Sequence, residues 1–281
     1  MRKSNICIIL LSIIIVGILI PVGFSTNDKL IVITYGETTQ HNSNYKSTVD
    51  EFFKQQSNLD PNNINSKIIT ANDVNKISKS ITGKTYTSDQ VFSSALVNLK
   101  DNNDLKVSVD KSKITTITGE MYLSALKSAG IKSGHVYVTS PVTATGESAL
   151  AGIMNSYEEA TNVKIPETVK EAANDEIFTQ AEIVENSKVN SDDLSKLVDN
   201  VKQTVKENNI TDHKTIVNVI NNYTKNNNIN MSNNDIENLA TSIEKIQNAQ
   251  GDVNNYESQV STSINGSSSN SENNLLGGIF N

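Results

Sequence analysis

The chain has a single cysteine, no tryptophan and only three histidines. The cysteine, Cys7, lies in an apolar N-terminal stretch, so the remainder of the chain cannot form disulfides, cysteine nucleophiles, iron–sulfur clusters or cysteine-bearing zinc sites. The histidines, at positions 41, 135 and 213, never stand four residues apart, so no metal site is predicted. Neither Gly-x-Gly-x-x-Gly nor a phosphate-binding loop occurs, and we expect no cofactor.

Basic residues are also in short supply. The 281 residues include 24 Lys and Arg against 31 Asp and Glu, which gives a formal net charge of −7. Because nucleic-acid binding relies on clustered Lys and Arg that neutralise phosphates, we expect no nucleic-acid partner. With 36% hydrophobic residues, the length allows one large domain or two small ones with a substantial core.

The first 25 residues carry an export pattern. Arg2 and Lys3 precede an apolar run over 6–20, and Gly23-Phe24-Ser25 has the small-x-small form of a signal-peptidase site. The apolar block is about 19 residues long through Phe24 and spans about 28 Å as a helix, close to the hydrocarbon thickness of a bilayer. Residues 1–25 are therefore predicted to be either a signal peptide cleaved near Ser25, which gives a secreted protein, or an N-terminal membrane anchor. Either route places the remainder outside the cytoplasm, touching the membrane only through this segment.

Residues 28–187 alternate strand and helix signals. Short β-branched runs predict strands over 30–35, 64–70, 114–117 and 135–139. The runs 91–99 and 105–109 flank a polar turn, which favours a β-hairpin, with a helix over 88–99 as the competing interpretation. Apolar residues at helical spacing predict helices over 45–56, 118–129, 150–161 and from Pro166 onward.

Strand signals cease near residue 185. Three amphipathic stripes then begin near the capping residues Ser191, Thr211 and Ser232, which predicts an all-α region over 190–250, either a three-helix bundle or an extension packed on the α/β part. From Gly251 the composition turns to Ser and Asn, and we expect a disordered tail over 251–281. The predicted fold class is α/β (α+β): a small mixed sheet with packed helices, followed by a helical C-terminal region.

One strand–loop–helix unit offers a candidate ligand site. Thr143, Thr145 and the amides around Gly146 would surround the N-terminus of the helix that follows, where anions and polar ligands bind, although Thr145 could equally act as a cap. Glu120 and Glu147 both follow a Thr/Gly pair at a helix start, where they could converge or could stabilise the helix dipoles. The candidate ligand-binding residues are Thr115, Thr118, Glu120, Thr143, Thr145, Gly146 and Glu147.

No catalytic residue is assigned. The segment Gly146-Glu147-Ser148 invites comparison with the nucleophile elbow of serine hydrolases, but the second glycine, Gly152, comes two positions late. Ser148 is better explained as a residue in the first turn of a helix.

The central block resembles the DUF1002 family, the YpuA-like exported proteins of unknown function. The residues that carry the resemblance are Ile114-Thr115, Thr118, Met121-Tyr122, Ala125-Leu126, Ala129-Gly130-Ile131, Val136, Val138, Pro141-Val142, Gly146, Ala149-Leu150, Gly152-Ile153 and Tyr157-Glu158-Glu159-Ala160-Thr161. The likeness covers roughly 30–250 and is strongest over 114–161. It implies an export segment and supplies no catalytic residue.

These observations favour a non-enzymatic binding or interaction module of the cell envelope or the medium. Its partner would be an envelope protein, a surface polymer or a small polar ligand. The alternative is a hydrolase or transferase that acts outside the cytoplasm through Glu120 and Glu147, which would need their carboxylates to lie within about 5–10 Å of each other across a substrate.

Overall fold

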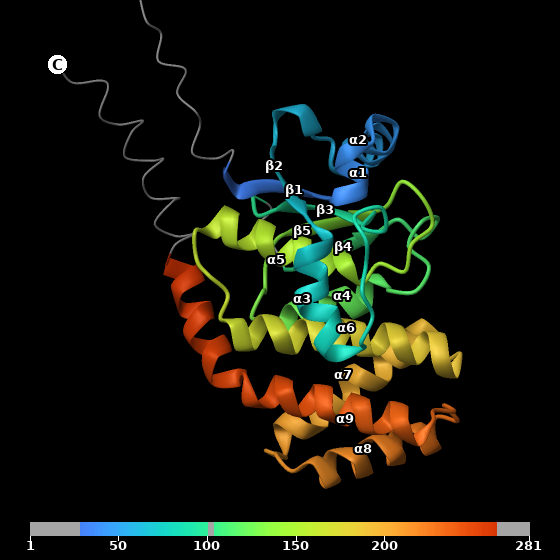
Figure 1. The fold of residues 1–281 in the computed structure, drawn as a ribbon. Coiled ribbons are helices and arrows are strands. Elements are labelled where there is room, and N and C mark those ends of the chain that lie inside the picture. Colours follow the sequence, from blue (N-terminus) through green and yellow to red (C-terminus); the bar gives the residue numbers. More distant parts are fainter. Residues whose placement is uncertain (1–28, 101–103, 263–281) are drawn as a thin grey trace, which may run out of the picture.

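The computed structural model describes residues 29–100 and 104–262. The predicted signal or anchor segment and the end of the chain beyond residue 262 lie outside the described residues. Figure 1 shows a sheet with helices on both faces and, below it, a layer of longer helices. Within the described ranges, none of the helices combines the length and the apolar character that a membrane crossing needs.

The sheet is mixed and has five strands in the order β2-β1-β3-β5-β4. β3 runs antiparallel to its two neighbours, β1 and β5, and β2 and β4 each lie parallel to their neighbour at the two edges. All six residues of β1 are buried, because helices cover both of its faces. The strands are β1 (Ile31–Gly36), β2 (Asn65–Ile69), β3 (Ser94–Asn98), β4 (Lys106–Val109) and β5 (His135–Thr139).

The hairpin prediction over 91–109 is wrong. β3 and β4 do form as strands, which also overturns the alternative of a helix over 88–99, but β5 lies between them. Lys106 of β4 is in register with His135 of β5, and Asn98 of β3 pairs with the same residue from the other side. The more apolar β5 occupies the buried inner position, and the half-exposed β4 is left at the edge. The predicted strand over 114–117 is reduced to one bridge between Ile114 and Ala144.

Helices cover the two faces of the sheet unequally. On one face, Val49 and Phe53 pack against Ile33, Leu96 and Tyr137. The elements on this side are α1 (Glu37–His41), α2 (Ser43–Ser57) and the short 3₁₀ helix η2 (Pro61–Asn63). The opposite face bears the main core and the helices α3 (Ala71–Ile81), α4 (Gly119–Ser128), α5 (Ser148–Thr161) and α6 (Glu167–Ser187). α3 was not predicted, although Thr70 and Asp73 form a complete capping box at its start.

The C-terminal helices form an extension of this core. α6 lies between the sheet layer and α9, so the helical region is not a separate three-helix bundle (Figure 1). One hydrophobic cluster runs without interruption from Val32 in the sheet to Tyr256 near the end of the described chain. The fold is therefore α+β with a helical C-terminal region, as predicted. The remaining helices are α7 (Ser191–Glu207), α8 (His213–Asn226) and α9 (Asn233–Asn248).

Helical structure extends past the point where a tail was expected. Residues 250–262 are helical, and Val253 and Tyr256, three positions apart, are buried. Glu257 pairs with Lys132 at 2.6 Å, and the Thr168 hydroxyl donates to Asp252 at 2.6 Å. Val253, Tyr256 and the half-buried Val260 form an apolar face that packs on the core, and composition alone did not reveal that face.

Candidate functional site

The two loops singled out from the sequence lie side by side. The amide of Ala144 donates to the carbonyl of Lys113 at 2.9 Å, and the amide of Thr115 donates back to Ala144 at 3.0 Å. One step further on, the amide of Ile117 donates to Thr145 at 3.1 Å. The backbone of the first candidate loop therefore contacts the second, as a common site requires.

The side chains of these loops do not converge. Thr118 caps α4 by accepting the amide of Met121 at 3.2 Å, and Glu120 is exposed in the first turn. Thr143 is exposed as well. The interpretation of Thr145 as the cap of α5 is wrong, because Glu147 occupies that position and makes no capping side-chain bond.

The N-terminus of α5 is filled by the protein itself. Gly146 has φ of +109°, and a β-carbon there would stand 2.7 Å from Ile114 Cγ2 and 2.8 Å from the Tyr122 hydroxyl. That hydroxyl donates to the carbonyl of Gly146. Glu147 is 3% exposed and accepts a 2.7 Å bond from Tyr86, whose pKa is raised by burial and by the charge of Glu147. Buried Glu147 and exposed Glu120 therefore occupy different environments.

Two of the predicted residues do line a hollow of about 320 Å³. Thr115 and Thr118 contribute to it together with Asn190 and Asp192 at the start of α7. The residues from Thr143 to Glu147 do not line this hollow. The predicted site is thus divided between a surface hollow and a buried helix end.

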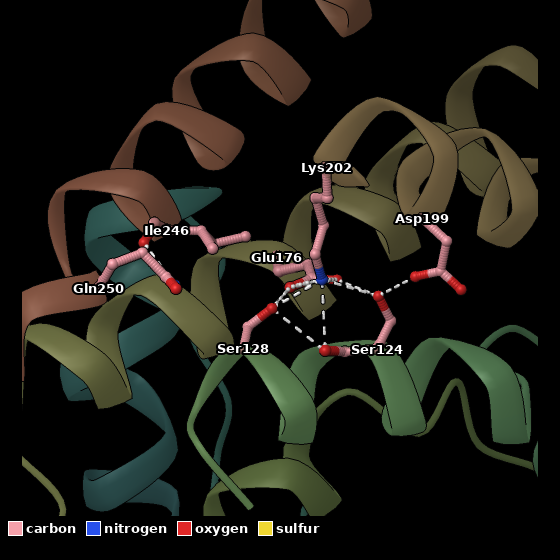
Figure 2. A network of polar contacts seen from close by, with 7 residues as sticks. All are labelled: Ser124, Ser128, Glu176, Asp199, Lys202, Ile246 and Gln250. Carbon is pink, nitrogen blue, oxygen red and sulfur yellow. Dashed lines mark hydrogen bonds and ion pairs between the residues drawn. The ribbon is translucent and has the colours of Figure 1, made fainter. Parts of the chain in front are cut away.

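A buried polar network joins α4, α6 and α7 (Figure 2). Lys202 donates to Ser124 Oγ at 2.8 Å, to Ser128 Oγ at 2.6 Å, and to the two carboxylate oxygens of Glu176 at 2.8 and 3.0 Å. The Ser124 hydroxyl also contacts Asp199 at 2.5 Å. Glu176 is completely buried, and Lys202 is 17% exposed. The network fastens the helical extension to the sheet layer.

The chemistry of this network is structural. A serine nucleophile activated by lysine needs a neutral amine as its base. Lys202 instead forms an ion pair with Glu176, and its ammonium protons are directed at the carboxylate and at the two serine hydroxyls. The arrangement lacks a free amine lone pair that could take the proton of Ser124.

A small hollow of about 190 Å³ opens beside the network. Its floor includes Ser124, Ser128 and Lys202, whose donors are already engaged with one another and with Glu176. Ile246 and Gln250 of the C-terminal helices close one side (Figure 2). The hollow is also lined by Lys127, Lys206 and Gln247.

A larger cavity, with a volume of about 470 Å³, lies on the opposite side of α6. This volume lies within the range of about 300–1,000 Å³ that is typical of small-molecule sites. The apolar part of its lining comes from α3, α5 and the end of β2, and charged side chains of both signs surround it. The lining residues are Ile69, Asp73, Lys76, Ile77, Ile81, Ala151, Met154, Asn155, Glu167, Lys170, Glu171, Asn174, Asp175 and Lys245.

Ion pairs occupy most of the charges at this cavity. Lys170 lies 3.0 Å from Glu167 and 3.1 Å from the buried carboxylate of Glu158. Burial opposes the charge on Lys170, but its hydrogen bonds to these carboxylates outweigh burial and raise its pKa. On the far side, Lys245 of α9 lies 2.5 Å from Asp175.

Sequence reasoning missed the three consecutive buried polar residues of α6. Asn174, Asp175 and Glu176 are each at most 4% exposed. Asn174 and Asp175 line the large cavity, and Glu176 belongs to the network. The helix predicted from Pro166 onward has one apolar side, formed by Val169, Ala173, Ile177, Ala181 and Val184. Polar residues in a helix usually mark its solvent-exposed face, so the local pattern gave no signal that these three residues are buried.

The fold and these hollows define a mixed α+β protein with a helical extension and polar cavities between its layers. The sequence matches the family described as "Protein of unknown function (DUF1002)" over residues 35–263, and the chain belongs to that family. It is 32% identical over 163 residues to the "Uncharacterized protein YpuA" of Bacillus subtilis (strain 168). The match covers 57% of this chain and 56% of that protein. No solved structure matches the chain.

Proposed function

We propose that this protein is a non-enzymatic binding module that works outside the cytoplasm, as a membrane-anchored or secreted protein. The observation that carries the binding role is the cavity of about 470 Å³, which combines an apolar lining with charged and amide side chains. Such a combination suits a ligand with an apolar body and a polar group.

Two further features support a binding role over catalysis. The buried network of α4, α6 and α7 ties its serines and its lysine to the carboxylate of Glu176. The two carboxylates considered for acid–base chemistry are also unlike each other, since Glu147 is buried under Tyr86 and Glu120 is exposed.

The proposed location rests on the N-terminal sequence. Arg2 and Lys3, the apolar run and Gly23-Phe24-Ser25 together form the export pattern. Mass spectrometry of the native N-terminus, after cell fractionation, tests it. A chain that begins near Thr26 in the medium, or an intact Met1 in the membrane fraction, would support the proposal. A full-length chain in the soluble cytoplasmic fraction would overturn it.

The binding role is tested by filling the cavity. Asn155 lines it and is half-buried, so Asn155→Trp should reduce its volume. Asn218→Trp on the exposed surface of α8 is the matched control. The protein, purified from the fraction in which it is found, is screened by thermal shift against small polar molecules and envelope polymer fragments. We expect a ligand whose stabilising effect is lost in Asn155→Trp and kept in Asn218→Trp. Equal effects in both variants would contradict a role for this cavity.

A further inference from the structure

The ion pair between Asp175 and Lys245 is unevenly covered. The side chain of Asp175 is 6% exposed, and that of Lys245 is 48% exposed. The carboxylate is fixed on α6 in the middle of the core, whereas the ammonium reaches it from α9 on a long, flexible stem. A buried carboxylate requires a cationic partner, but nothing in this geometry requires that partner to be Lys245.

One buried acceptor at this cavity lacks a donor. Asp175 uses one carboxylate oxygen, Oδ1, for its bond with Lys245. The neighbouring Asn174 is 1% exposed, and its Oδ1 is buried without a partner, while its Nδ2 donates to the carbonyl of Lys170 at 2.8 Å. Both residues line the cavity. Unpaired buried acceptors are costly, so a ligand that brings N–H donors gains more here than in water.

The remaining charges favour a cation over an anion. Asp73, Glu167, Glu171 and Asp175 supply four carboxylates to the lining, against the three ammonium groups of Lys76, Lys170 and Lys245. Lys170 is held by Glu158 and Glu167, and Lys76 lies 3.8 Å from Asp73. Glu171 is exposed and has no ion-pair partner among the described residues. An incoming cation therefore meets a surplus of negative charge.

The apolar part of the lining determines the shape of the ligand. Ile69, Ile77, Ile81, Ala151 and Met154 form a surface that suits an aliphatic chain rather than a compact ion. An aliphatic stem could lie on these side chains while its charged end reaches Asp175, as the stem of a lysine does on an apolar surface.

We propose that the cavity binds a primary alkylammonium group on an aliphatic stem, and that this group displaces Lys245 from Asp175. The inference rests on the proposed binding function and names the class of its ligand. When no ligand is bound in the cavity, Lys245 neutralises the charge of Asp175. The same chemistry is present in a free aliphatic diamine and in the lysine side chain of a peptide.

The test uses isothermal titration with three probes of equal length: 1,5-diaminopentane, 1,5-pentanediol and glutarate. We expect the wild-type protein to bind the diamine and to bind the diol and the diacid at least about ten-fold more weakly. Asp175→Asn should weaken diamine binding about ten-fold or more. If Asp175→Asn fails to fold, Glu171→Gln serves in its place with an expected loss of about two- to three-fold.

The decisive variant is Lys245→Met, because displacement predicts a gain. Removal of the competing ammonium should strengthen diamine binding about ten-fold, and the diamine should raise the melting temperature of this variant more than that of the wild type. Lys225→Met on the exposed surface of α8, away from the cavity lining, is the matched control and should change diamine affinity less than two-fold. Weaker diamine binding by Lys245→Met would overturn the proposal, as would the absence of diamine binding.

Two further results separate the possible outcomes. Tighter binding of acetyl-Gly-Lys-Gly-amide than of the diamine, lost when the lysine is acetylated, would identify a peptide as the source of the ammonium. If glutarate or the diol binds best and Asn155→Trp abolishes that binding, the binding function stands and the alkylammonium class fails. If neither these probes nor the wider screen gives binding that depends on the cavity, both proposals fail.

Discussion

Asp175 and Glu176 are adjacent in α6 but serve opposite sides of the molecule. Glu176 is completely buried, and its partner Lys202 is 17% exposed and contacts two serine hydroxyls as well. Asp175 is nearly as buried, but its partner Lys245 is 48% exposed beside a cavity of about 470 Å³. The lysine of one ion pair is largely covered, and the lysine of the other is half-exposed.

The difference shows how one helix can serve both stability and binding. In the covered pair, every group has protein partners, so loss of Lys202 leaves the buried carboxylate of Glu176 without a cation. In the open pair, water or another cation can take the place of the lysine, so the same loss costs less. We therefore expect mutations on the two sides of α6 to differ in magnitude and, at one position, in sign.

The largest effect should come from Lys202→Met. This change leaves Glu176 buried without a cation, and we expect the free energy of unfolding to fall by about 3–4 kcal/mol. Urea denaturation followed by circular dichroism measures it, with Lys206→Met on the same helix as a control that should stay within about 0.5 kcal/mol. A loss below about 1 kcal/mol for Lys202→Met would show that Glu176 does not require this cation.

Lys245→Met should have a smaller effect on stability. Asp175 loses its ion pair, but the cavity admits water, so the expected loss is about 1–2 kcal/mol in the same urea experiment. If Lys245→Met proves as costly as Lys202→Met, the contrast between the two sides of α6 does not hold.

Replacement of Gln180 should stabilise the protein, in contrast to the two lysine mutations. Its side chain is fully buried in α6, and both amide atoms lack hydrogen-bond partners. Gln180→Met keeps a similar shape and removes the unpaired amide, so we expect a gain of about 1 kcal/mol in the free energy of unfolding. The exposed Gln203→Met on α7 is the control for the change in side-chain type. Destabilisation by Gln180→Met would mean that the amide has a partner in solution, such as an ordered water.

The smallest effect concerns a third, exposed contact between α8 and α9. His213 lies 2.8 Å from Glu237 and 3.1 Å from Glu244. The hydrogen bond to Glu237 raises the pKa of His213. Slight burial opposes this shift, and the hydrogen bond to Glu244 adds to it. Stabilisation is therefore complete below the unfolded value near 6.5 and is lost as the pH rises through the raised folded value. We expect a contribution within about 0.5 kcal/mol.

Urea titrations at pH 5.5 and pH 8.5 test this contact. The stability difference between the wild type and His213→Gln should be present at the lower pH and vanish at the higher one. A difference that is equal at both values would show that the charge of His213 plays no part.

Features set by neighbouring residues could be predicted from the sequence. The N-cap at Thr118 and the cap of α9 at Ser232 both appear where short-range capping rules place them. Hydrophobic patterns within single segments likewise predicted the buried strands β1 and β5 and the apolar stripes of α7, α8 and α9. The mixed fold class followed from these elements.

Features that depend on distant partners could not be predicted. The insertion of β5 between β3 and β4 is decided by packing across the whole sheet, whereas turn composition favoured a hairpin. The contact between Ser124 and Lys202 joins residues 78 positions apart, and that between Asp175 and Lys245 spans 70 positions. The two loops proposed as one site do meet through their backbones, but the position of their side chains depended on Tyr86 and Tyr122, which no spacing rule connects to Gly146 or Glu147.

The helix over residues 250–262 affects the time at which the core can close during synthesis. Its Val253 packs so near Gly130 that a β-carbon on the glycine would stand 3.0 Å from Val253 Cγ1, and its Glu257 pairs with Lys132 from 125 positions away. At about 5–20 residues per second, the ribosome completes these partners several seconds after α4 has been made. Until then the end of α4 remains uncovered, so the growing chain cannot finish folding before its last part is available.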